Sequence, residues 1–387
     1  MSPVSVIIVS YKVKHYIEQC IDSVFRSVPD AQVIVVDNDS GDGSVEFLRE
    51  RFPGIAVIAN NANVGFGKAN NQALELVESP YVLFLNPDTV VCESTIPKCI
   101  EYLSDNPNAG ACGVRMQHSD GRFALESRRS IPTPFVSFCH MTGLGRIFPN
   151  SRRFARYHMT FLDRNKDCDV EVISGACMMV RSNLVRSLGG FDESFFMYGE
   201  DIDLSFRILQ AGYTNRYISV PIVHYKGEST VKTSYRYAKV FYDAMLIFYS
   251  KHFGKYSHVL SFFVRVIVFV RKLFTFVGQN LLAGRRRFTL EKEPCLFVGS
   301  HDNFTKVQAL LSSSRYLCEL TWADKCGCLE FDDTLLDGKK AIVFDTSAFE
   351  YEMIFNWMYR KASGGLFLNM GLYNPDNNHL ITKDETL

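Results

Sequence analysis

The sequence lacks both of the commonest phosphate-binding motifs. No GxGxxG turn follows its first strand-like run, and no GxxxxGKS/T loop occurs anywhere in its 387 residues. Dinucleotide-binding and P-loop folds therefore lose their main sequence support. The fragment Asn63-Val-Gly65-Phe-Gly67 is only part of a glycine-rich turn. The length predicts two or three domains, at about 150 residues per domain.

A disulfide framework and a signal peptide are also missing. The eleven cysteines are scattered, and the only tight pair, Cys326-Gly-Cys328, has no second pair or nearby histidine to complete a zinc site. Free thiols are therefore favoured over a metal there. The N-terminus, MSPVSVIIVSYK, has no basic region and no small-residue cleavage site. These features predict a cytosol-facing protein with reduced thiols.

Acidic residues are absent from one long segment. The whole chain is neutral, with 42 Lys and Arg against 42 Asp and Glu. Residues 244–290, however, hold eight basic residues and no acid, a net charge of +8. Residues 1–243 carry −2 (25 basic, 27 acidic) and residues 291–387 carry −6 (nine basic, fifteen acidic). The zero sum therefore hides three parts of different character.

The acid-free segment 244–290 has helical spacing. Polar residues from His258 to Gln279 recur in steps of three and four, which places them on one helix face with apolar residues around it. No uncharged apolar run there approaches the roughly 20 residues that a membrane-spanning helix needs. We expect the segment to lie on an anionic membrane surface, although a helix packed on the protein's own core is the alternative. Nucleic acid is a poor partner, because apolar burial is the stronger feature.

Four strand-like runs alternate with helical stretches in the first 110 residues. This alternation predicts βαβ units and a parallel sheet covered on both faces. The runs lie at residues 4–9, 32–36, 55–59 and 81–85, with helices at about 17–27 and 67–77.

Three polar clusters follow these runs, where ligands of such sheets bind. They are Ser10-Tyr11, Asp37-Asn38-Asp39-Ser40 and Asn86-Pro87-Asp88. Each alone could be a set of turn and cap formers. Three on one sheet edge indicate a binding crevice.

Acidic residues crowd the start of a helix expected at residues 201–210. Glu200, Asp201 and Asp203 could compensate the helix dipole, but one or two acids suffice for that. The preceding run Phe195-Phe196-Met197-Tyr198 would desolvate one carboxylate, and the raised pKa that follows suits a general base.

An ordered set of segments over residues 3–235 resembles family 2 glycosyltransferases of the GT-A fold, and within them the rhamnosyltransferase-like enzymes of bacterial surface polysaccharides. The segments are SVIIVSYK, VIVVDNDSGDGS, NVGFGKANNQAL, YVLFLNPDTVV, ISGACMMVR, GGFDESFFMYGEDIDLSFR and HYKGEST. The resemblance implies inverting transfer of a sugar from a nucleotide-diphosphate donor to a hydroxyl group of a lipid-linked or polysaccharide acceptor.

The resemblance also assigns roles to residues. Asp201, with Glu200, matches the catalytic base. Asp88 and His224 match metal ligands for Mg²⁺ or Mn²⁺. Asn86 stands in place of the first acid of the family's DxD motif. Because only one carboxylate remains, the metal is expected to arrive with the donor. His224 could instead be a core or strand-edge histidine. The donor-binding positions are Ser10, Tyr11, Asp37, Asn38, Asn63, Gly65, Asn70 and Asn86.

Three parts are therefore expected. Residues 1–243 form the GT-A domain, 244–290 a basic amphipathic helical segment, and 291–387 a small Rossmann-like α/β domain. The last is suited equally to docking or oligomerisation and to a second ligand site. We expect a cytoplasmic enzyme associated peripherally with the inner face of the cytoplasmic membrane. The alternative is a non-catalytic GT-A-fold scaffold in a glycan-assembly complex, which Asn86 keeps open.

Overall fold

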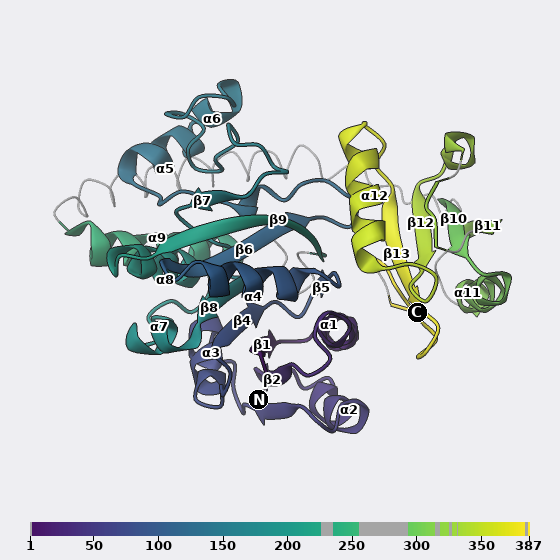
Figure 1. Cartoon of the computed structure of the whole chain (residues 1–387), viewed down its shortest axis with the longest axis horizontal. Helices are drawn as coiled ribbons and strands as arrows, with labels where there is room; N and C mark the ends of the chain where they lie inside the picture. The colour runs from purple at the N-terminus through teal and green to yellow at the C-terminus, as the bar shows by residue number, and fades with distance from the viewer. Residues whose placement is uncertain are drawn as a thin grey trace.

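The computed structural model contains two sheets, flanked by helices (Figure 1). It describes residues 2–225, 235–254, 293–313, 318–324, 327–330, 332–383 and 386–387. Most of the expected basic segment, residues 255–290, lies outside this range. None of the described helices combines the length and the apolarity that crossing a bilayer requires.

The larger sheet is built from the first 224 residues. Its strands are β1 (Val4–Ser10), β2 (Gln32–Asp37), β3 (Ala56–Ala59), β4 (Tyr81–Leu85), β5 (Thr89–Val91), β6 (Ala109–Gln117), β7 (Cys168–Val170), β8 (Cys177–Arg181) and β9 (Thr214–His224). They lie in the order β3-β2-β1-β4-β8-β6-β9-β5, with β7 beside β9.

The four expected strands pair in parallel as β3-β2-β1-β4, which confirms the α/β expectation for this part. The rest of the sheet is mixed, because β8 runs antiparallel to both β4 and β6. The run ISGACMMVR, residues 173–181, predicts one buried strand, but the strand begins only at Cys177. Residues 173–176 form the turn before it, and this turn becomes part of the site described below.

Helices cover both faces of the larger sheet. They are α1 (Lys14–Ser27), α2 (Ser44–Arg51), α3 (Phe66–Leu74), α4 (Thr95–Asp105), α5 (Pro134–Met141), α6 (Leu144–Ile147), α7 (Ser182–Ser187), α8 (Glu200–Gln210) and α9 (Tyr235–His252), with a 3₁₀ turn at Leu125–Ser127. Alternate residues of β1 serve the two faces: Val6 and Ile8 pack with α1 and α4, whereas Ile7 and Val9 pack with α3 and α8. The boundary expected at residue 243 falls inside α9.

The C-terminal residues form a smaller sheet of α/β type, as expected. Its elements are β10 (Glu293–Gly299), α11 (His301–Ser313), β11 (Cys318–Asp324), a 3₁₀ turn at Asp333–Leu336, β12 (Ala341–Asp345), α12 (Tyr351–Ser363), β13 (Asn369–Asn374) and β14 (His379–Ile381). The strand order is β11-β10-β12-β13-β14. The apolar run at residues 366–369 predicts a short strand, and this prediction is wrong: β13 begins only at Asn369, and Leu366 still belongs to the turn after α12, where its N–H donates to the Lys361 carbonyl.

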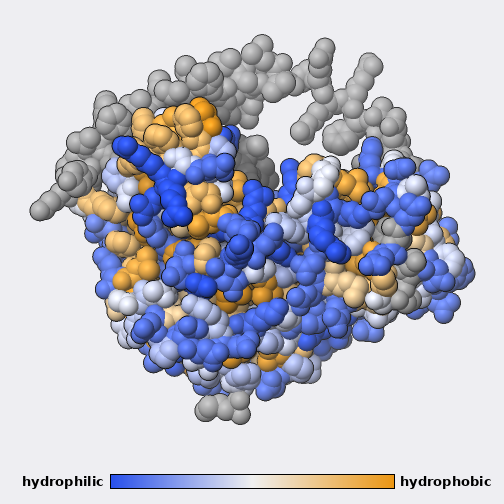
Figure 2. All heavy atoms as spheres, turned by 45° about the horizontal axis from the view of Figure 1, so that its top comes forward, coloured by the Kyte–Doolittle hydropathy of each residue, from blue (hydrophilic) through white to orange (hydrophobic). Residues whose placement is uncertain are grey.

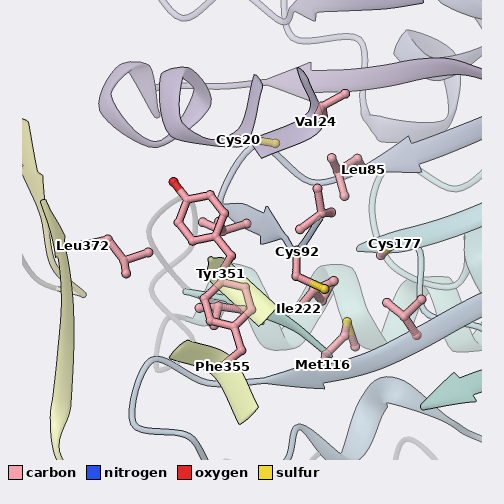
Figure 3. Packing of buried hydrophobic residues seen from close by; sticks show 14 of the residues in the cluster. Cys20, Val24, Leu85, Cys92, Met116, Cys177, Ile222, Tyr351, Phe355 and Leu372 are labelled. Carbon is pink, nitrogen blue, oxygen red and sulfur yellow. The ribbon is translucent and has the colours of Figure 1, made fainter. Parts of the chain in front are cut away.

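Helix α12 joins the two sheets into one packed body. It lies between them in Figure 1, and in Figure 3 Tyr351 and Phe355 point from α12 towards Met116, Cys92 and Ile222 of the larger unit. The carboxylate of Glu93 accepts from the backbone N–H groups of Tyr351 (2.9 Å) and Glu352 (3.1 Å). The free N–H groups at the start of α12 are thus satisfied by the other unit.

Candidate active site

The candidate site lies at the carboxyl ends of β1, β2 and β4. Because β2 and β3 lie on one side of β1 and β4 lies on the other, the strand order reverses at β1. Open α/β sheets bind ligands outside such a reversal. The last residues of β1 and β2, Ser10 and Asp37, are in register with each other.

The side chains of Ser10 and Asp37 are buried and only partly satisfied. Asp37 Oδ2 accepts from the backbone N–H of Ser40 at 3.0 Å, whereas Asp37 Oδ1 and Ser10 Oγ have no partner among the described residues. Buried polar atoms without partners are costly unless a ligand satisfies them. Tyr11, next in the chain, is half-buried, with its ring 5.3 Å from Lys12 Nζ.

Asn38 ties the second polar cluster to the glycine turn. Its Nδ2 donates to Asn63 Oδ1 (3.1 Å) and to the Gly65 carbonyl (3.3 Å), and its Oδ1 accepts from the N–H of Val64 (3.1 Å). Asn60, which lies in no motif of the sequence, donates to the same Oδ1 at 3.2 Å. Asn38 is therefore buried as a support for the turn.

Gly65 permits a close approach between this turn and the loop before α8. It has a φ of +91°, and a Cβ there would lie 2.7 Å from the carbonyl oxygen of Phe196. That carbonyl accepts from the N–H of Phe66 at 2.9 Å. On α3, Asn70 donates to the Phe66 carbonyl, and its buried Oδ1 has no partner among the described residues.

Asn86, Asp88 and His224 converge at the end of β4. His224 Nε2 lies 3.2 Å from Asp88 Oδ1 and 3.3 Å from Asn86 Nδ2. The pairing of β5 with β9 places them together, since Thr89 is in register with His224 and the Tyr225 N–H donates to the Asp88 carbonyl. All three side chains are at least half-buried.

This cluster provides one carboxylate oxygen and one imidazole nitrogen. No group of three His, Cys, Asp or Glu side chains suited to a metal occurs among the described residues. Mg²⁺ is commonly held by one or two protein ligands, with water and substrate phosphates completing an octahedron. Asp88 and His224 therefore fit a cation whose remaining ligands come from water and substrate phosphates, and the protein alone does not supply a complete coordination shell.

The carboxylates of Glu200 and Asp201 lie at the N-terminus of α8, after Gly199 in the left-handed conformation. Asp201 Oδ2 accepts from the N–H of Gly175 at 3.0 Å, and its Oδ1 accepts from the N–H of Ile202 at 2.8 Å. A Cβ on Gly175 would lie 3.2 Å from the Asp201 Cβ, so a small residue is required there. Glu200 is buried beside it.

Arg129 is the residue that the sequence analysis missed. Its guanidinium forms an ion pair with Asp201 Oδ2, although the two residues are 72 positions apart. Backbone hydrogen bonds with Val172 hold Arg129 in place. A basic residue after the 3₁₀ turn carries no local pattern that would have identified it.

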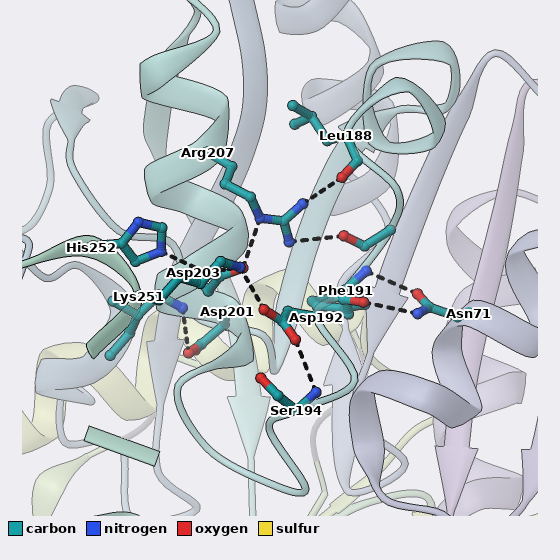
Figure 4. Close-up of polar contacts among 12 residues, drawn as sticks. Asn71, Leu188, Phe191, Asp192, Ser194, Asp201, Asp203, Arg207, Lys251 and His252 are labelled. Carbon is teal, nitrogen blue, oxygen red and sulfur yellow. Dashed lines mark hydrogen bonds and ion pairs between the residues drawn. The ribbon is translucent and has the colours of Figure 1, made fainter. Parts of the chain in front are cut away.

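Asp203 anchors α9 to α8, as Figure 4 shows. Its buried carboxylate accepts from Arg207 Nε (2.7 Å), Lys251 Nζ (2.8 Å) and His252 Nε2 (2.7 Å). Lys251 also contacts Asp192 Oδ2 at 2.5 Å. Of the three acids at the start of α8, Asp203 is thus structural, and the other two face the site.

One turn connects the two halves of the site. The carbonyl of Ala176 accepts from the N–H of Asn86 at 3.0 Å, and the adjacent Gly175 donates to Asp201. The cluster of Asn86, Asp88 and His224 and the carboxylate pair are therefore held by consecutive residues. Such an arrangement can bind a leaving group at one side and remove a proton at the other.

Comparisons with known proteins show what the chain is similar to. The family described as "Glycosyl transferase family 2" matches residues 5–189, and "Glycosyl transferase family group 2" matches residues 144–288. The chain is 28% identical over 296 residues to N-acetylglucosaminyl-diphospho-decaprenol L-rhamnosyltransferase of Mycobacterium tuberculosis. The aligned region covers 73% of this chain and 95% of that protein.

Two further similarities were found. Rhamnosyltransferase WbbL of Escherichia coli (strain K12) is 26% identical over 250 residues, covering 60% of this chain and 89% of that protein. Among solved structures, the mannosyltransferase PcManGT from Pyrobaculum calidifontis, in complex with GDP-Man and Mn²⁺, aligns with 81% of this chain and 82% of that chain. The identity is 17% and the TM-score 0.44.

Proposed function

We propose that the chain is a rhamnosyltransferase-like nucleotide-sugar glycosyltransferase of family 2, which transfers a rhamnose-like sugar, with inversion, to a hydroxyl group of a lipid-linked or polysaccharide acceptor. The observation that carries the proposal is the pair of clusters held by Gly175 and Ala176. The donor and acceptor classes follow the name of the mycobacterial relative, which acts on a diphospho-decaprenol.

Ser10 and Asp37 bind the nucleotide in this proposal. Their buried oxygens without partners point to a donor that supplies hydrogen-bonding groups at the end of β1 and β2. Asn63 and Gly65 shape the turn beside it, Asn38 supports that turn, and Asn70 offers a further acceptor oxygen. Tyr11 borders the nucleotide.

Asp201 acts as the general base. It takes the proton of the acceptor hydroxyl while that oxygen forms a bond to the anomeric carbon, and the bond between this carbon and the diphosphate oxygen breaks in the same step. The electron pair leaves with the nucleoside diphosphate. Attack opposite the leaving group inverts the anomeric configuration.

Arg129 and Glu200 set the orientation and the charged surroundings of Asp201. The guanidinium of Arg129 pairs with Asp201 Oδ2 and orients the carboxylate. Burial, reinforced by the charge of Asp201, raises the pKa of Glu200 to about 8. A neutral Glu200 at neutral pH avoids a second negative charge beside the base.

Asp88 and His224 would hold a divalent cation, Mg²⁺ or Mn²⁺, with Asn86 donating a hydrogen bond at its edge. When bound, such an ion neutralises charge that develops on the departing diphosphate. The protein contributes two converging ligands, one from the turn before β5 and one from the end of β9, and the donor contributes the rest.

We also propose the arrangement at the membrane. Residues 244–290 associate with an anionic surface and follow the catalytic part, residues 1–243, while residues 291–387 form the packed C-terminal unit. The enzyme would then act at the cytoplasmic face of the membrane, where a lipid-linked acceptor is presented.

A transfer assay across nucleotide-diphosphate sugars, with and without Mn²⁺, tests the function. One donor should be consumed only when a glycan-diphospho-polyprenol acceptor is present. Asp201→Asn should lower turnover by about 10³-fold or more, with donor affinity retained in calorimetry. If no donor is consumed, the proposed activity is wrong. If Asp201→Asn keeps wild-type turnover, Asp201 is not the base.

A further inference from the structure

A second stretch without acidic residues lies far from the segment 244–290 in sequence. Residues 127–162 contain six arginines and no Asp, Glu or Lys. The stretch includes α5, α6 and the turn that follows them. In contrast to residues 255–290, it lies entirely within the described part of the chain.

This stretch exposes large apolar side chains at its outer surface. Figure 2, turned so that this part faces forward, shows apolar side chains gathered on the larger unit beside strongly hydrophilic ones. The exposed fractions are 43% for Phe135, 52% for Phe138, 67% for Ile147 and 49% for Phe148. Apolar side chains clustered in this way mark an interaction surface, whereas isolated ones do not.

The exposed side chains are not simply the core face of a loosely packed helix. The other side of α5 is already buried through Val136, Ser137 and Cys139, and the hydroxyl groups of Ser137 and Tyr249 lie 2.5 Å apart. Thr133 caps the helix by accepting from the N–H of Val136. The outer face is therefore held firmly with its phenylalanines directed outward.

Arginines surround the apolar side chains. The guanidinium of Arg153 lies 5.2 Å from the ring of Phe135 and 5.9 Å from that of Phe154, and Arg152 lies 5.5 Å from the ring of Phe161. Within the described residues, no acidic side chain forms an ion pair with Arg146, Arg152 or Arg153. By contrast, Arg156 pairs with Glu171.

We propose that Phe135, Phe138, Ile147 and Phe148, with Arg146, Arg152 and Arg153, form a docking face for an anionic lipid bilayer. Apolar residues enter the boundary between headgroups and acyl chains, and the arginines bind lipid phosphates. The charge selects this occupant, because a surface with three unpaired arginines and no acid attracts an anionic partner and repels a second copy of itself.

The docking face is linked to the proposed base. The chain runs from Arg129, which pairs with Asp201, through Ile131, which packs with Phe195 and Ile202, directly into α5. Docking would therefore bring the bilayer to the segment that holds Arg129. The proposal rests on surface chemistry and holds whether or not the transferred sugar is correctly assigned.

Sedimentation of the full-length protein with vesicles tests the face. Vesicles of phosphatidylglycerol and phosphatidylcholine should bind the wild type, and vesicles of phosphatidylcholine alone should bind it weakly. The triple variant Phe138→Ser, Ile147→Ser, Phe148→Ser should lower partitioning at least tenfold. Arg146→Gln, Arg152→Gln and Arg153→Gln should each lower it about fivefold at low salt. The matched control replaces exposed apolar residues elsewhere, Leu76→Ser, Leu335→Ser and Phe367→Ser.

Three results would overturn the docking face. Unchanged partitioning of the Phe138, Ile147 and Phe148 variant would assign lipid binding elsewhere. A change of oligomeric state in light scattering, with lipid binding retained, would assign the face to a second copy. A lower melting temperature of the triple variant, with lipid binding retained, would mean that another segment of the same chain packs on this face. Turnover on a water-soluble acceptor analogue reports the transfer reaction separately, and the triple variant should keep it.

Discussion

Glu200 illustrates how burial sets the chemistry of a single residue. Its Oε2 has no hydrogen-bond partner among the described residues, and the carboxylate of Asp201 follows directly. Burial and this neighbour raise its pKa from 4.5 to about 8. Because folding favours the protonated form, the stability it contributes is fully present below about pH 4.5 and is lost as the pH rises towards 8.

Replacing Glu200 by glutamine should remove this pH dependence. We expect the free energy of unfolding of the wild type to fall between pH 5 and pH 8 relative to that of Glu200→Gln, because the amide cannot ionise. Urea unfolding at several pH values measures it. Glu46→Gln, at an exposed glutamate in the first turn of α2, is the matched control and should leave the wild-type slope unchanged. Parallel curves for the wild type and Glu200→Gln would contradict a neutral, buried Glu200.

Asn86 offers a second prediction at the scale of one residue. The amide faces His224 and lies near Asp88, so that Asn86→Asp would add a second carboxylate to the cluster. We expect the affinity for Mn²⁺ in the absence of donor to rise about tenfold, because divalent cations favour carboxylate oxygens. Titration calorimetry measures this affinity, with Asp88→Ala expected to weaken it. Identical Mn²⁺ binding by the wild type and both variants would place the cation elsewhere.

These residues also show what the sequence could reveal. The polar clusters after β1, β2 and β4 were predictable, since strand ends in a parallel sheet share one edge. His224 was found only through resemblance, because its approach to Asp88 depends on the pairing of β5 with β9. Arg129 had no signal at all. Its contact with Asp201 joins segments that meet only in the folded chain.

At the scale of helices, Asp203 couples α8 to α9. Burial would raise the pKa of its carboxyl group, but the hydrogen bonds from Lys251 and His252 and the charge of Arg207 lower it below its ordinary value. The carboxylate is fully buried and surrounded by these three basic side chains. The helix that bears Glu200 and Asp201 is thereby fixed against the helix that leads into residues 255–290.

Asp203→Ala should therefore destabilise the protein by about 3–5 kcal/mol, because it leaves buried cationic groups without their counter-ion. Urea unfolding at pH 7 measures the change. Asp243→Ala, at an exposed acid on α9, is the matched control and should have an effect within about 0.5 kcal/mol. A small loss for Asp203→Ala, close to that of the control, would show that α9 is held mainly by its apolar contacts.

Strands and helices differed in how well the sequence located them. Continuous apolar runs identified β1, β2 and β4 almost to the residue, because buried parallel strands need such sequence. The β13 strand was misplaced because Leu366 and Leu368 looked like strand residues, whereas the chain is still leaving α12 there. Helices α5 and α6 were not foreseen, since their outer faces are apolar and obscure a helical pattern.

For the whole molecule, the main question is how the C-terminal unit relates to the larger one. The expected division at residue 291 separates two sheets, and the C-terminal sheet has a small cluster of its own, but the largest buried cluster spans both units. Tyr351 and Phe355 belong to the same buried cluster as Ile17 and Ile222. The sequence could not show this, because β-branched and aromatic runs identify elements and not the surfaces that elements share.

The shared core predicts how the protein unfolds. Phe355 is completely buried, its ring stacks on Tyr351 at 5.6 Å, and its carbonyl accepts from Gln117 Nε2 of the larger unit. Phe355→Ala should cost about 3–5 kcal/mol and lower the midpoint of one cooperative transition. Calorimetry combined with urea unfolding, followed by near-UV and far-UV signals, measures both quantities.

The exposed Phe367 provides the control for this experiment, since Phe367→Ala removes a ring of the same size from the surface of the C-terminal unit. We expect a loss below about 1 kcal/mol there, as for most surface substitutions. If instead Phe355→Ala splits the transition in two, with the larger sheet melting at its original midpoint, residues 291–387 are an independent domain. A single, shifted transition means that the C-terminal unit stabilises the catalytic sheet through α12, and that its removal would impair the site without touching any catalytic residue.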